Sequence, residues 1–442
     1  MFRKLLRSTA SLYSKTTPFQ TFCSAANPSH NPTLILSKHF KAIKQLQYDS
    51  FRMKPPQSKI SKIEGKRLRD LGFLRPFGEF AKSIDIYSIE DVPKIEGANT
   101  PSASWVGINF PLKQDPFIKN IFKKFYTDGI RVGKLMEIFD LIGGASAYRY
   151  LDLDILSRDA TIVTLCVDNF HLFEEVISTD RDIFISSYVS YAGTSSLEVQ
   201  VDVTYTDDPH AIIASASYLF VARDAQDYSK PKKVPKLVFD GEFDVDGCIL
   251  RYEYGKINQK DRKQSTEKST FKVAPSSEES EHLHRLFKHT LDPKNASEYI
   301  PIPNTSVEKT LLMHLQDKNI HNKVFGGFLM KEAADLAWTT SYLHGGGSYP
   351  DFVHIDDIMF LNPVEIGSVS IFKSWITYVE DNLAHVMITV DTLKNRLEKH
   401  RTCEFHMTLS HPQPIPKVMP VSYFDGMTYI EGQRRVHDVK RF

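Results

Sequence analysis

The chain has 442 residues, of which 41% are hydrophobic and 25% charged, and its formal net charge is +1. This length exceeds what one ordinary hydrophobic core accommodates, so we expect two folded domains with extensions. The near-neutral charge excludes a global field that would select nucleic acid or an acidic partner. No uninterrupted apolar run is long enough to span a bilayer, so we expect no stable membrane insertion. The four cysteines are widely separated without metal-ligand spacing, which favours a reducing compartment and predicts no metal site.

Residues 1–30 have the composition of an organelle transit peptide. Arg3, Lys4 and Arg7 alternate with leucines and hydroxyl residues, and the first acidic residue is Asp49. A basic, acid-free segment that can form an amphipathic helix is typical of mitochondrial import signals, whereas its apolar stretch is too short for a secretory signal. The sequence therefore predicts a protein of the mitochondrial matrix. The alternative is that these residues form a disordered basic tail.

Changes of composition divide the chain into six segments. The region between the two apolar, patterned segments is rich in Lys, Ser and Glu, and such a composition buries little apolar surface. We predict a transit peptide at 1–30, an N-terminal extension without assigned function at 31–105, a first folded domain at 106–225, a charged linker with short local structure at 226–300, a second folded domain at 301–412 and a Pro-rich C-terminal tail at 413–442.

The two folded segments repeat one order of elements, a helix that begins at glycine and is followed by strands of alternating pattern. Residues 328–342 are apolar around most of the helical circumference, which predicts a largely buried helix. Residues 167–173 resemble residues 355–361, and residues 187–203 align without gaps on residues 374–390. The sequence therefore predicts an α+β fold with two copies of an antiparallel sheet wrapped around one long buried helix.

The start of the second helix has the features of an oxyanion hole. The first N–H groups of a helix lack intrahelical partners and carry partial positive charge. Gly326 and Gly327 have no side chains there, so a substrate carbonyl can approach the backbone closely. Asn322, just upstream, carries an amide that can orient a carbonyl or a water. The alternative is a tight loop that merely requires glycine.

The first helix carries an acid, Asp140, whose sequence neighbours are all apolar. An ionised carboxylate among apolar side chains costs several kcal/mol unless it is compensated. Two interpretations are open at this point. Asp140 is either paired structurally with Arg131 or Lys134, or it is a general base whose pKa is tuned by burial.

The two copies carry complementary polar residues. When the helix starts are superimposed at their glycines, Asp128 lies opposite Asn322 and Asp140 lies opposite Ala334. Each copy alone lacks either the acid or the amide. If the helices meet at a pseudo-twofold interface, Asp140 and Asn322 complete one site. The reciprocal site would contain Asp128 and Asp335, two carboxylates without an amide, and it is the poorer candidate.

These motifs resemble a known enzyme family. The segments 322–330 (NKVFGGFLM) and 355–367 (IDDIMFLNPVEIG) are similar to the hotdog-domain acyl-CoA thioesterases, and 131–140 (RVGKLMEIFD) resembles the N-terminal half of the tandem-hotdog mitochondrial acyl-coenzyme A thioesterases. In that family a helix-borne acid of one hotdog acts together with an Asn ahead of the other hotdog's helix. The matching residues are Asp140 and Asn322. The asymmetry between the two copies is a departure that counts against the second site, so we expect one active site per chain.

The resemblance implies hydrolysis of acyl-CoA thioesters to free fatty acid and CoA, a step of fatty acid metabolism, without a cofactor. Asp140 would be the general base, and the acyl carbonyl would lie against the N–H groups of Gly326 and Gly327. We also expect Phe325 and Gly133, which belong to the two helix starts, to bind substrate. The expected assembly is a homo-oligomer of double-hotdog units that associate through their sheets.

Two other functions remain open from the sequence. The protein could be a catalytically silent hotdog subunit, structural or acyl-binding, in a mitochondrial assembly. It could also be an enoyl-CoA hydratase, which requires a catalytic histidine, for which His354 is the candidate.

Overall fold

The computed structural model describes residues 59–62, 84–89, 92, 95–153, 159–239, 245–319, 322–394 and 398–441. All of them belong to one compact unit, Lys44–Phe442. The predicted transit peptide and most of the predicted N-terminal extension lie outside the described residues.

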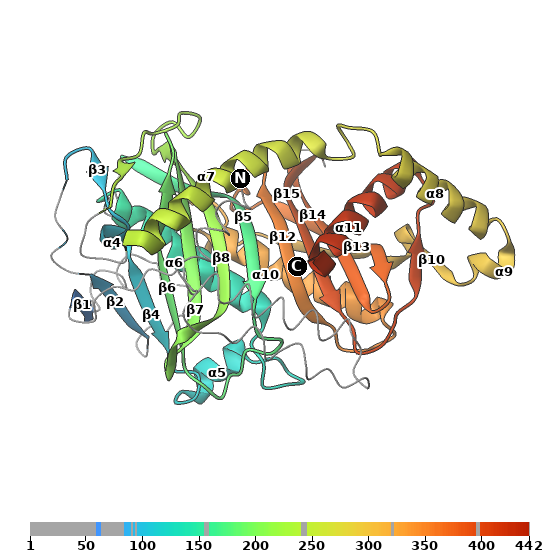
Figure 1. Ribbon diagram of the computed structural model, residues 1–442, viewed down its shortest axis with the longest axis horizontal. Coiled ribbons are helices and arrows are strands. Elements are labelled where there is room, and N and C mark those ends of the chain that lie inside the picture. Colours follow the sequence, from blue (N-terminus) through green and yellow to red (C-terminus); the bar gives the residue numbers. More distant parts are fainter. Residues whose placement is uncertain are drawn as a thin grey trace, which may run out of the picture. The chain divides into compact units, whose positions relative to one another are not determined.

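The predicted repeat is present as two units with the same order of elements (Figure 1). The first contains β4 (Val106–Phe110), α6 (Val132–Tyr150), β5 (Ala160–Leu172), β6 (Ile183–Ala192), β7 (Ser196–Tyr205) and β8 (Asp208–Asp224). The second contains β11 (Val307–Leu312), α10 (Gly326–His344), β12 (Asp351–Phe360), β13 (Val369–Glu380), β14 (Leu383–Lys394) and β15 (Glu398–Ser410).

The strands of both units form one continuous antiparallel sheet. Its order is β1-β2-β4-β6-β7-β8-β5-β12-β15-β14-β13-β11. The order on one side of the β5–β12 junction is the reverse of the order on the other, so a pseudo-twofold axis passes between these two strands. Two short N-terminal strands, β1 (Ile60–Lys62) and β2 (Asp85–Ile89), extend the first half of the sheet.

The register of the sheet repeats down to its irregularities. The bulge between Asp168 and His171 in β5 recurs between Asp356 and Met359 in β12, at the spacing predicted by aligning 167–173 on 355–361. The pairing of β6 with β7 has a bulge between Val189 and Tyr191, and the pairing of β13 with β14 has one between Ile376 and Tyr378. These positions correspond in the gap-free alignment of 187–203 on 374–390 that the sequence predicted. Bulges bend a strand, so their conservation between the halves gives both sheets the same curvature.

Helices α6 and α10 lie side by side on the inner face of the sheet (Figure 1). Each is 19 residues long, and most of their side chains are buried. The helices approach closely at their glycine starts: a Cβ on Gly133 would lie 3.1 Å from the carbonyl oxygen of Lys331, and one on Gly327 would lie 2.8 Å from the carbonyl oxygen of Glu137. The apolar circumference predicted for the second helix is explained by this arrangement, because each helix contacts a sheet on one side and its partner helix on another.

Each half of the sheet has a second helix on its outer face, and neither helix was predicted. Helix α7 (Val245–Lys268) crosses the first half, and α11 (Tyr423–Arg441) crosses the second (Figure 1). A Cβ on Gly255 of α7 would lie 2.7 Å from Tyr191, and one on Gly432 of α11 would lie 2.9 Å from the repeat counterpart, Tyr378. The predicted linker therefore contains a longer helix than expected, and the predicted Pro-rich tail contains one as well. Both belong to the repeat.

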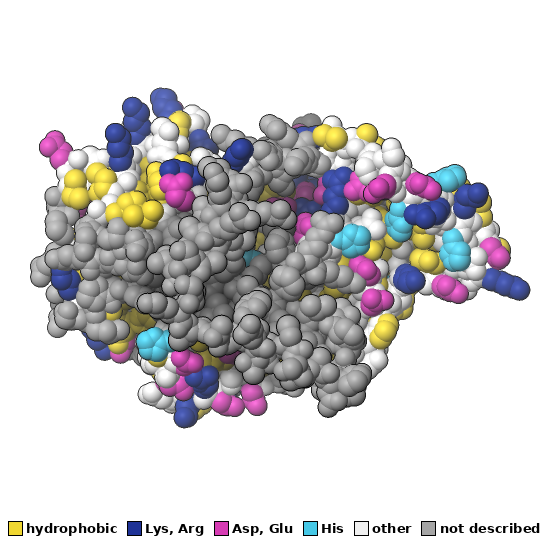
Figure 2. Space-filling model, viewed as in Figure 1, with side chains coloured by type: hydrophobic (Ala, Val, Ile, Leu, Met, Phe, Trp, Pro, Cys, Tyr) yellow, Lys and Arg dark blue, Asp and Glu magenta, His cyan; other side chains and the backbone are white. Residues whose placement is uncertain are grey.

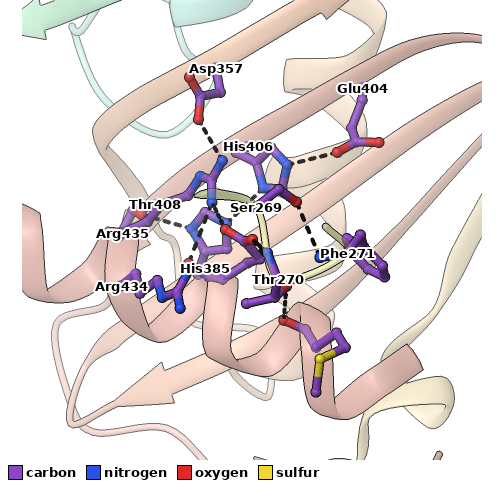
Figure 3. A network of polar contacts seen from close by, with 12 residues as sticks. Ser269, Thr270, Phe271, Asp357, His385, Glu404, His406, Thr408, Arg434 and Arg435 are labelled. Atoms are coloured by element: carbon purple, nitrogen blue, oxygen red, sulfur yellow. Dashed lines mark hydrogen bonds and ion pairs between the residues drawn. The ribbon is translucent and has the colours of Figure 1, made fainter. Parts of the chain in front are cut away.

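Buried polar contacts hold these outer helices to the sheet. In the first half, Arg262 of α7 forms ion pairs with Asp168 and Glu198, whose side chains are 13% and 0% exposed. In the second half, Arg435 of α11 contacts Asp357 at 2.5 Å, part of the network drawn in Figure 3. A buried charge is tolerated when it is paired and hydrogen-bonded, which allows polar segments to cover a sheet.

A chain of hydrogen bonds runs beside the Arg435 contact (Figure 3). His385 bonds Thr408 at 3.1 Å and His406 at 3.1 Å, and His406 bonds Glu404 at 3.1 Å. Burial holds the pKa of His385 well below its ordinary value. The chain satisfies polar side chains that the alternation of β14 and β15 directs toward α11.

The other described elements are short or peripheral. Helix α8 (Ser277–Thr290) has no buried residue, and Figure 2 shows histidine, acidic and basic side chains interspersed where α8 and α9 lie in Figure 1. None of the helices in the described part of the chain is long and apolar enough to cross a membrane. The remaining elements are β3 (Ala98–Asn99), α4 (Pro101–Ser104), α5 (Pro116–Phe122), β9 (Lys236–Leu237), α9 (Pro293–Ala296), β10 (Tyr299–Pro301), η4 (Ile302–Thr305), η5 (Leu315–Asp317) and β16 (Lys417–Met419).

Candidate active site

The carboxylate of Asp140 lies where the two halves meet. It projects from α6, and the residue is 3% exposed. Its Oδ1 accepts a hydrogen bond from Thr164 Oγ1 of β5 at 2.7 Å, and its Oδ2 accepts one from the backbone N–H of Gly327 at 2.7 Å. Gly327 belongs to the first turn of α10, so a helix start of the second half holds an acid of the first half.

Burial raises the pKa of Asp140 to about 6, although the hydrogen bonds from Thr164 and Gly327 favour the ionised form. The ion pairs considered from the sequence are not formed. Arg131 instead contacts Asp335 at 3.0 Å, and Lys134 contacts Glu137 at 2.6 Å. The interpretation as a structurally paired acid is therefore wrong. A buried acid with a pKa close to neutrality is the state that a general base requires.

The glycines at the start of α10 allow the two halves to approach. A Cβ on Gly326 would lie 3.0 Å from Asp140 Oδ2, so a side chain there would displace the carboxylate. We expected the N–H groups of both Gly326 and Gly327 to face a substrate carbonyl. The Gly327 N–H donates to Asp140 instead, because α6 packs against this helix start and brings the carboxylate to it. Phe325, the N-cap residue, precedes the two glycines.

A cavity of about 950 Å³ opens beside Asp140. Its wall contains Phe325 and Gly326, whereas Gly327 and Gly133 lie in the helix contact and are not among its described lining residues. One part of the wall is formed by α6, β5 and β8 and is largely apolar, although it also contains Glu137, Thr161, Thr164 and Arg223. Another part is formed by residues 316–319, 323 and 361–365, and it carries the charged residues Asp317, Lys318, Lys323 and Glu365. Asp140 stands between these two parts.

The structure places the predicted amide at the surface. Asn322 is exposed, has a φ of +58° and accepts a hydrogen bond from Lys318 at 3.1 Å. Asn tolerates this left-handed backbone conformation better than most residues, which gives Asn322 a structural reason for its identity. Among the described residues the cavity wall contains Asn319 and not Asn322. The Oδ1 of Asn319 accepts a hydrogen bond from the backbone N–H of Lys323 at 3.1 Å, which orients the Asn319 amide.

The reciprocal position does not reproduce the site. Ala334 occupies the place that corresponds to Asp140, and its Cβ is 3.4 Å from where a Cβ of Gly133 would lie. Asp335 pairs with Arg131, and Asp128 is exposed and forms an ion pair with Lys123. The two reciprocal carboxylates are therefore engaged in separate surface pairs.

Thr164 and Asn319 were not identified from the sequence. Thr164 is 24 residues beyond Asp140 on a strand of alternating pattern, and no local pattern marks it. Asn319 lies in the same polar turn as Asn322, so the sequence offers two amides without a criterion to choose between them. The cavity wall supplies that criterion.

No family model matches the chain, but individual proteins do. Acyl-coenzyme A thioesterase 9, mitochondrial, from Mus musculus is 30% identical over 345 residues, which are 75% of this chain and 76% of the relative. The Homo sapiens protein of the same name is 30% identical over 349 residues, which are 76% of this chain and 77% of the relative. Among solved structures, an oleoyl thioesterase (putative) from Lactobacillus plantarum is 13% identical with a TM-score of 0.43, and the match covers 72% of this chain and 99% of that one.

The architecture defines the class of the protein. Two antiparallel sheets, each wrapped around a long buried helix and joined edge to edge about a pseudo-twofold axis, form a double hotdog, as predicted from the sequence. With relatives 30% identical over three quarters of its length, the chain belongs to the acyl-coenzyme A thioesterases.

Proposed function

We propose that the protein hydrolyses acyl-CoA thioesters to free fatty acid and CoA, at one site per chain between the two hotdog domains. The observation that carries this proposal is the position of Asp140. Its carboxylate is buried, accepts hydrogen bonds from a residue of each half, forms no ion pair with Arg131 or Lys134, and lines a large cavity. We further propose domain boundaries of 106–225 and 301–412, with α7 and α11 as additions to the respective domains.

Asp140 acts as the general base in the proposed mechanism. Its pKa of about 6 leaves the carboxylate ionised at the pH of the mitochondrial matrix. The carboxylate takes a proton from a water whose oxygen attacks the thioester carbonyl, and the tetrahedral intermediate collapses with departure of the CoA thiolate, which is then protonated. Proton transfer to a positioned side chain contributes roughly 10²–10⁴-fold. The hydrogen bonds from Thr164 and Gly327 fix the direction of the carboxylate.

The start of α10 stabilises the developing oxyanion. Because the Gly327 N–H orients the base, the N–H of Gly326 is the group that we assign to the carbonyl oxygen. It lies in the cavity wall at the positive end of the helix dipole. Loss of one such donor costs roughly 10²–10³-fold in turnover.

An amide completes the site, and two residues are candidates. Asn322 matches the motif, but it is exposed and bonded to Lys318. Asn319 lines the cavity and has its amide oriented by Lys323. We therefore assign Asn319 to the carbonyl or the attacking water and keep Asn322 as the alternative. The polar wall that carries Lys318 and Lys323 is our proposed place for the phosphates of CoA, because ammonium groups are common phosphate partners.

The names of the relatives and the composition of residues 1–30 support a mitochondrial location, and we propose the matrix. We also propose a homo-oligomer of double-hotdog units. Because α7 and α11 cover the outer faces of the sheet, these helices rather than the bare sheet would form the contacts.

The other two functions have less support. His354, which a hydratase would require, lies on β12 with its ring 6.1 Å from that of His171, and it is not among the described residues of the cavity wall. A silent subunit would not need a buried carboxylate with a raised pKa beside a cavity.

Release of free thiol from a panel of acyl-CoAs tests the proposal. We expect Asp140→Asn to lower kcat at least 10²-fold, and Asn319→Ala to lower it more than Asn322→Ala. Asp335→Asn, a matched change on the other central helix, should leave hydrolysis intact. Normal hydrolysis by Asp140→Asn would refute the mechanism, and loss of enoyl absorbance without thiol release would indicate a hydratase.

A further inference from the structure

The cavity beside Asp140 continues along one face of α6. Leu141, Gly144 and Tyr148 follow the catalytic acid at helical spacing and line the same cavity. Ile162 of β5 and Phe220 of β8 face them from the sheet. These residues are apolar, whereas the part of the wall at residues 316–319, 323 and 361–365 carries charged side chains, among them Lys318 and Lys323.

Gly144 is the residue that leaves this channel open. A Cβ at Gly144 would meet no described atom within 4 Å, although the residue lies in the middle of a buried helix. Its neighbour Gly143 is different, since a Cβ there would lie 3.1 Å from the ring of Phe220. Glycine in a helix interior costs roughly 0.5–1 kcal/mol relative to alanine. The packing around Gly144 offers no reason for that cost, whereas free space in the cavity does.

The second repeat shows the same channel closed. In the helix alignment Gly144 corresponds to Trp338, and Tyr148 corresponds to Tyr342. The Trp338 ring stacks on Tyr342 with centroids 5.1 Å apart and an interplanar angle of 12°. Its Nε1 donates to the carbonyl oxygen of Pro350 at 2.9 Å, and Pro350 is the repeat counterpart of the channel-lining Ile162. The indole thus fills the volume that is empty beside Gly144.

We propose that the channel along α6 holds the acyl chain, and that Gly144 and Tyr148 determine its length. This inference rests on the proposed thioesterase function. An acyl chain matches the apolar wall, and CoA matches the polar wall that carries Lys318 and Lys323. Asp140, between the two walls, is where the thioester carbonyl must lie.

We assign the far end of the apolar channel to Tyr148, because the cavity wall next to it is polar and contains Thr161, Arg223 and Ser229. Its side chain reaches from α6 to β5, where its hydroxyl oxygen accepts a hydrogen bond from the backbone N–H of Ile162 at 3.1 Å. Eight residues of helix separate Tyr148 from Asp140, a rise of about 12 Å. With C–C bonds of about 1.5 Å, an extended chain advances roughly 1.25 Å per methylene, so the channel accommodates an acyl group of about ten carbons. The protein should therefore prefer medium-chain acyl-CoAs.

A chain-length profile of kcat/KM, from butyryl-CoA to palmitoyl-CoA, tests this assignment. Gly144→Leu and Gly144→Trp place a side chain about 6 Å along the channel, beyond roughly five methylenes. Each methylene that is no longer buried lowers kcat/KM about fourfold. The kcat/KM for decanoyl-CoA should therefore fall on the order of 100-fold, whereas that for butyryl-CoA should change little. Gly144→Ala adds only a methyl group in open space, so its loss for decanoyl-CoA should be smaller than that of Gly144→Leu. Its Tm should be unchanged or higher, which separates blockage of the channel from loss of stability.

The outcomes separate the two proposals. Equal loss for butyryl-CoA and decanoyl-CoA in Gly144→Leu, or an unchanged profile, overturns the acyl-channel assignment while the thioesterase function stands. Absence of thiol release from every acyl-CoA by the wild-type protein overturns the thioesterase function itself. The assignment is supported if Gly144→Trp shifts the chain-length preference to short acyl-CoAs as Gly144→Leu does. Trp338 is the residue at the corresponding position of the second repeat, where the channel is closed.

Discussion

Replacing Asp140 by asparagine should abolish hydrolysis and stabilise the protein at the same time. Asparagine has nearly the same shape, and its Oδ1 can still accept the Gly327 N–H while its amide donates to Thr164, whose hydroxyl can rotate to accept. The substitution therefore removes the buried charge without creating a cavity. Thr164 and residue 140 both line the large cavity, where the displaced hydroxyl and amide hydrogens can donate to water. Because the packing is unchanged, the difference in the free energy of unfolding between wild type and variant measures the cost of burying the charge.

The magnitude follows from the pKa of Asp140, which is about 6 in the folded protein against an ordinary value of 3.8. About two pKa units at 1.36 kcal/mol per unit correspond to about 3 kcal/mol. Below about pH 4 the carboxyl is protonated in both states and costs nothing. Between about pH 4 and 6 the folded protein keeps a proton that the unfolded chain has lost, so the free energy of unfolding falls as pH rises. Above about pH 6 the full cost is present.

Denaturant unfolding of wild type and Asp140→Asn at pH 5, 6.5 and 8 measures this effect. The variant should be more stable by up to about 3 kcal/mol at pH 8, with a smaller difference at pH 5. Asp335→Asn is the control, because that half-exposed carboxylate is paired with Arg131 and its loss should bring no gain. Lower stability of Asp140→Asn at pH 8, or a difference independent of pH, would refute the reasoning that a buried charge is retained for catalysis.

Three further predictions concern the acid and the outer helix. The kcat/KM of wild type should fall about tenfold per pH unit below about pH 6, where Asp140 becomes protonated, and be level above it. Thr164→Val removes a hydrogen bond that lowers the pKa of Asp140, so the pH below which kcat/KM falls should rise by roughly one pH unit. If that pH does not change, the titrating group is not Asp140. Arg262→Met leaves Asp168 and Glu198 buried without their guanidinium partner and should lower the free energy of unfolding by about 3–5 kcal/mol, measured in denaturant. A loss below about 1 kcal/mol would mean that α7 does not depend on this pair.

The amino-acid sequence predicted the double-hotdog repeat because its signals are local. Alternation along 187–203 and 374–390, with short turns between strands, specifies strand register without knowledge of the partner strand. The outer helices α7 and α11 were missed because their segments are polar and charged. Their place on the sheet depends on buried ion pairs such as that of Arg262, and pairing across the fold is invisible in composition.

The sequence by itself also marked Asp140, since an acid within an apolar helix is a local anomaly, and it marked the glycines of the second helix start. Only the tertiary structure decided which partners they have. In the folded protein the Gly327 N–H donates to Asp140, whereas Arg131 and Lys134 form ion pairs with Asp335 and Glu137. Asn319 rather than Asn322 lies in the cavity wall. These choices depend on how two helices far apart in the chain pack across a pseudo-twofold axis. Helical periodicity determines which face a residue lies on, but the distance across that axis is set by the packing of both halves.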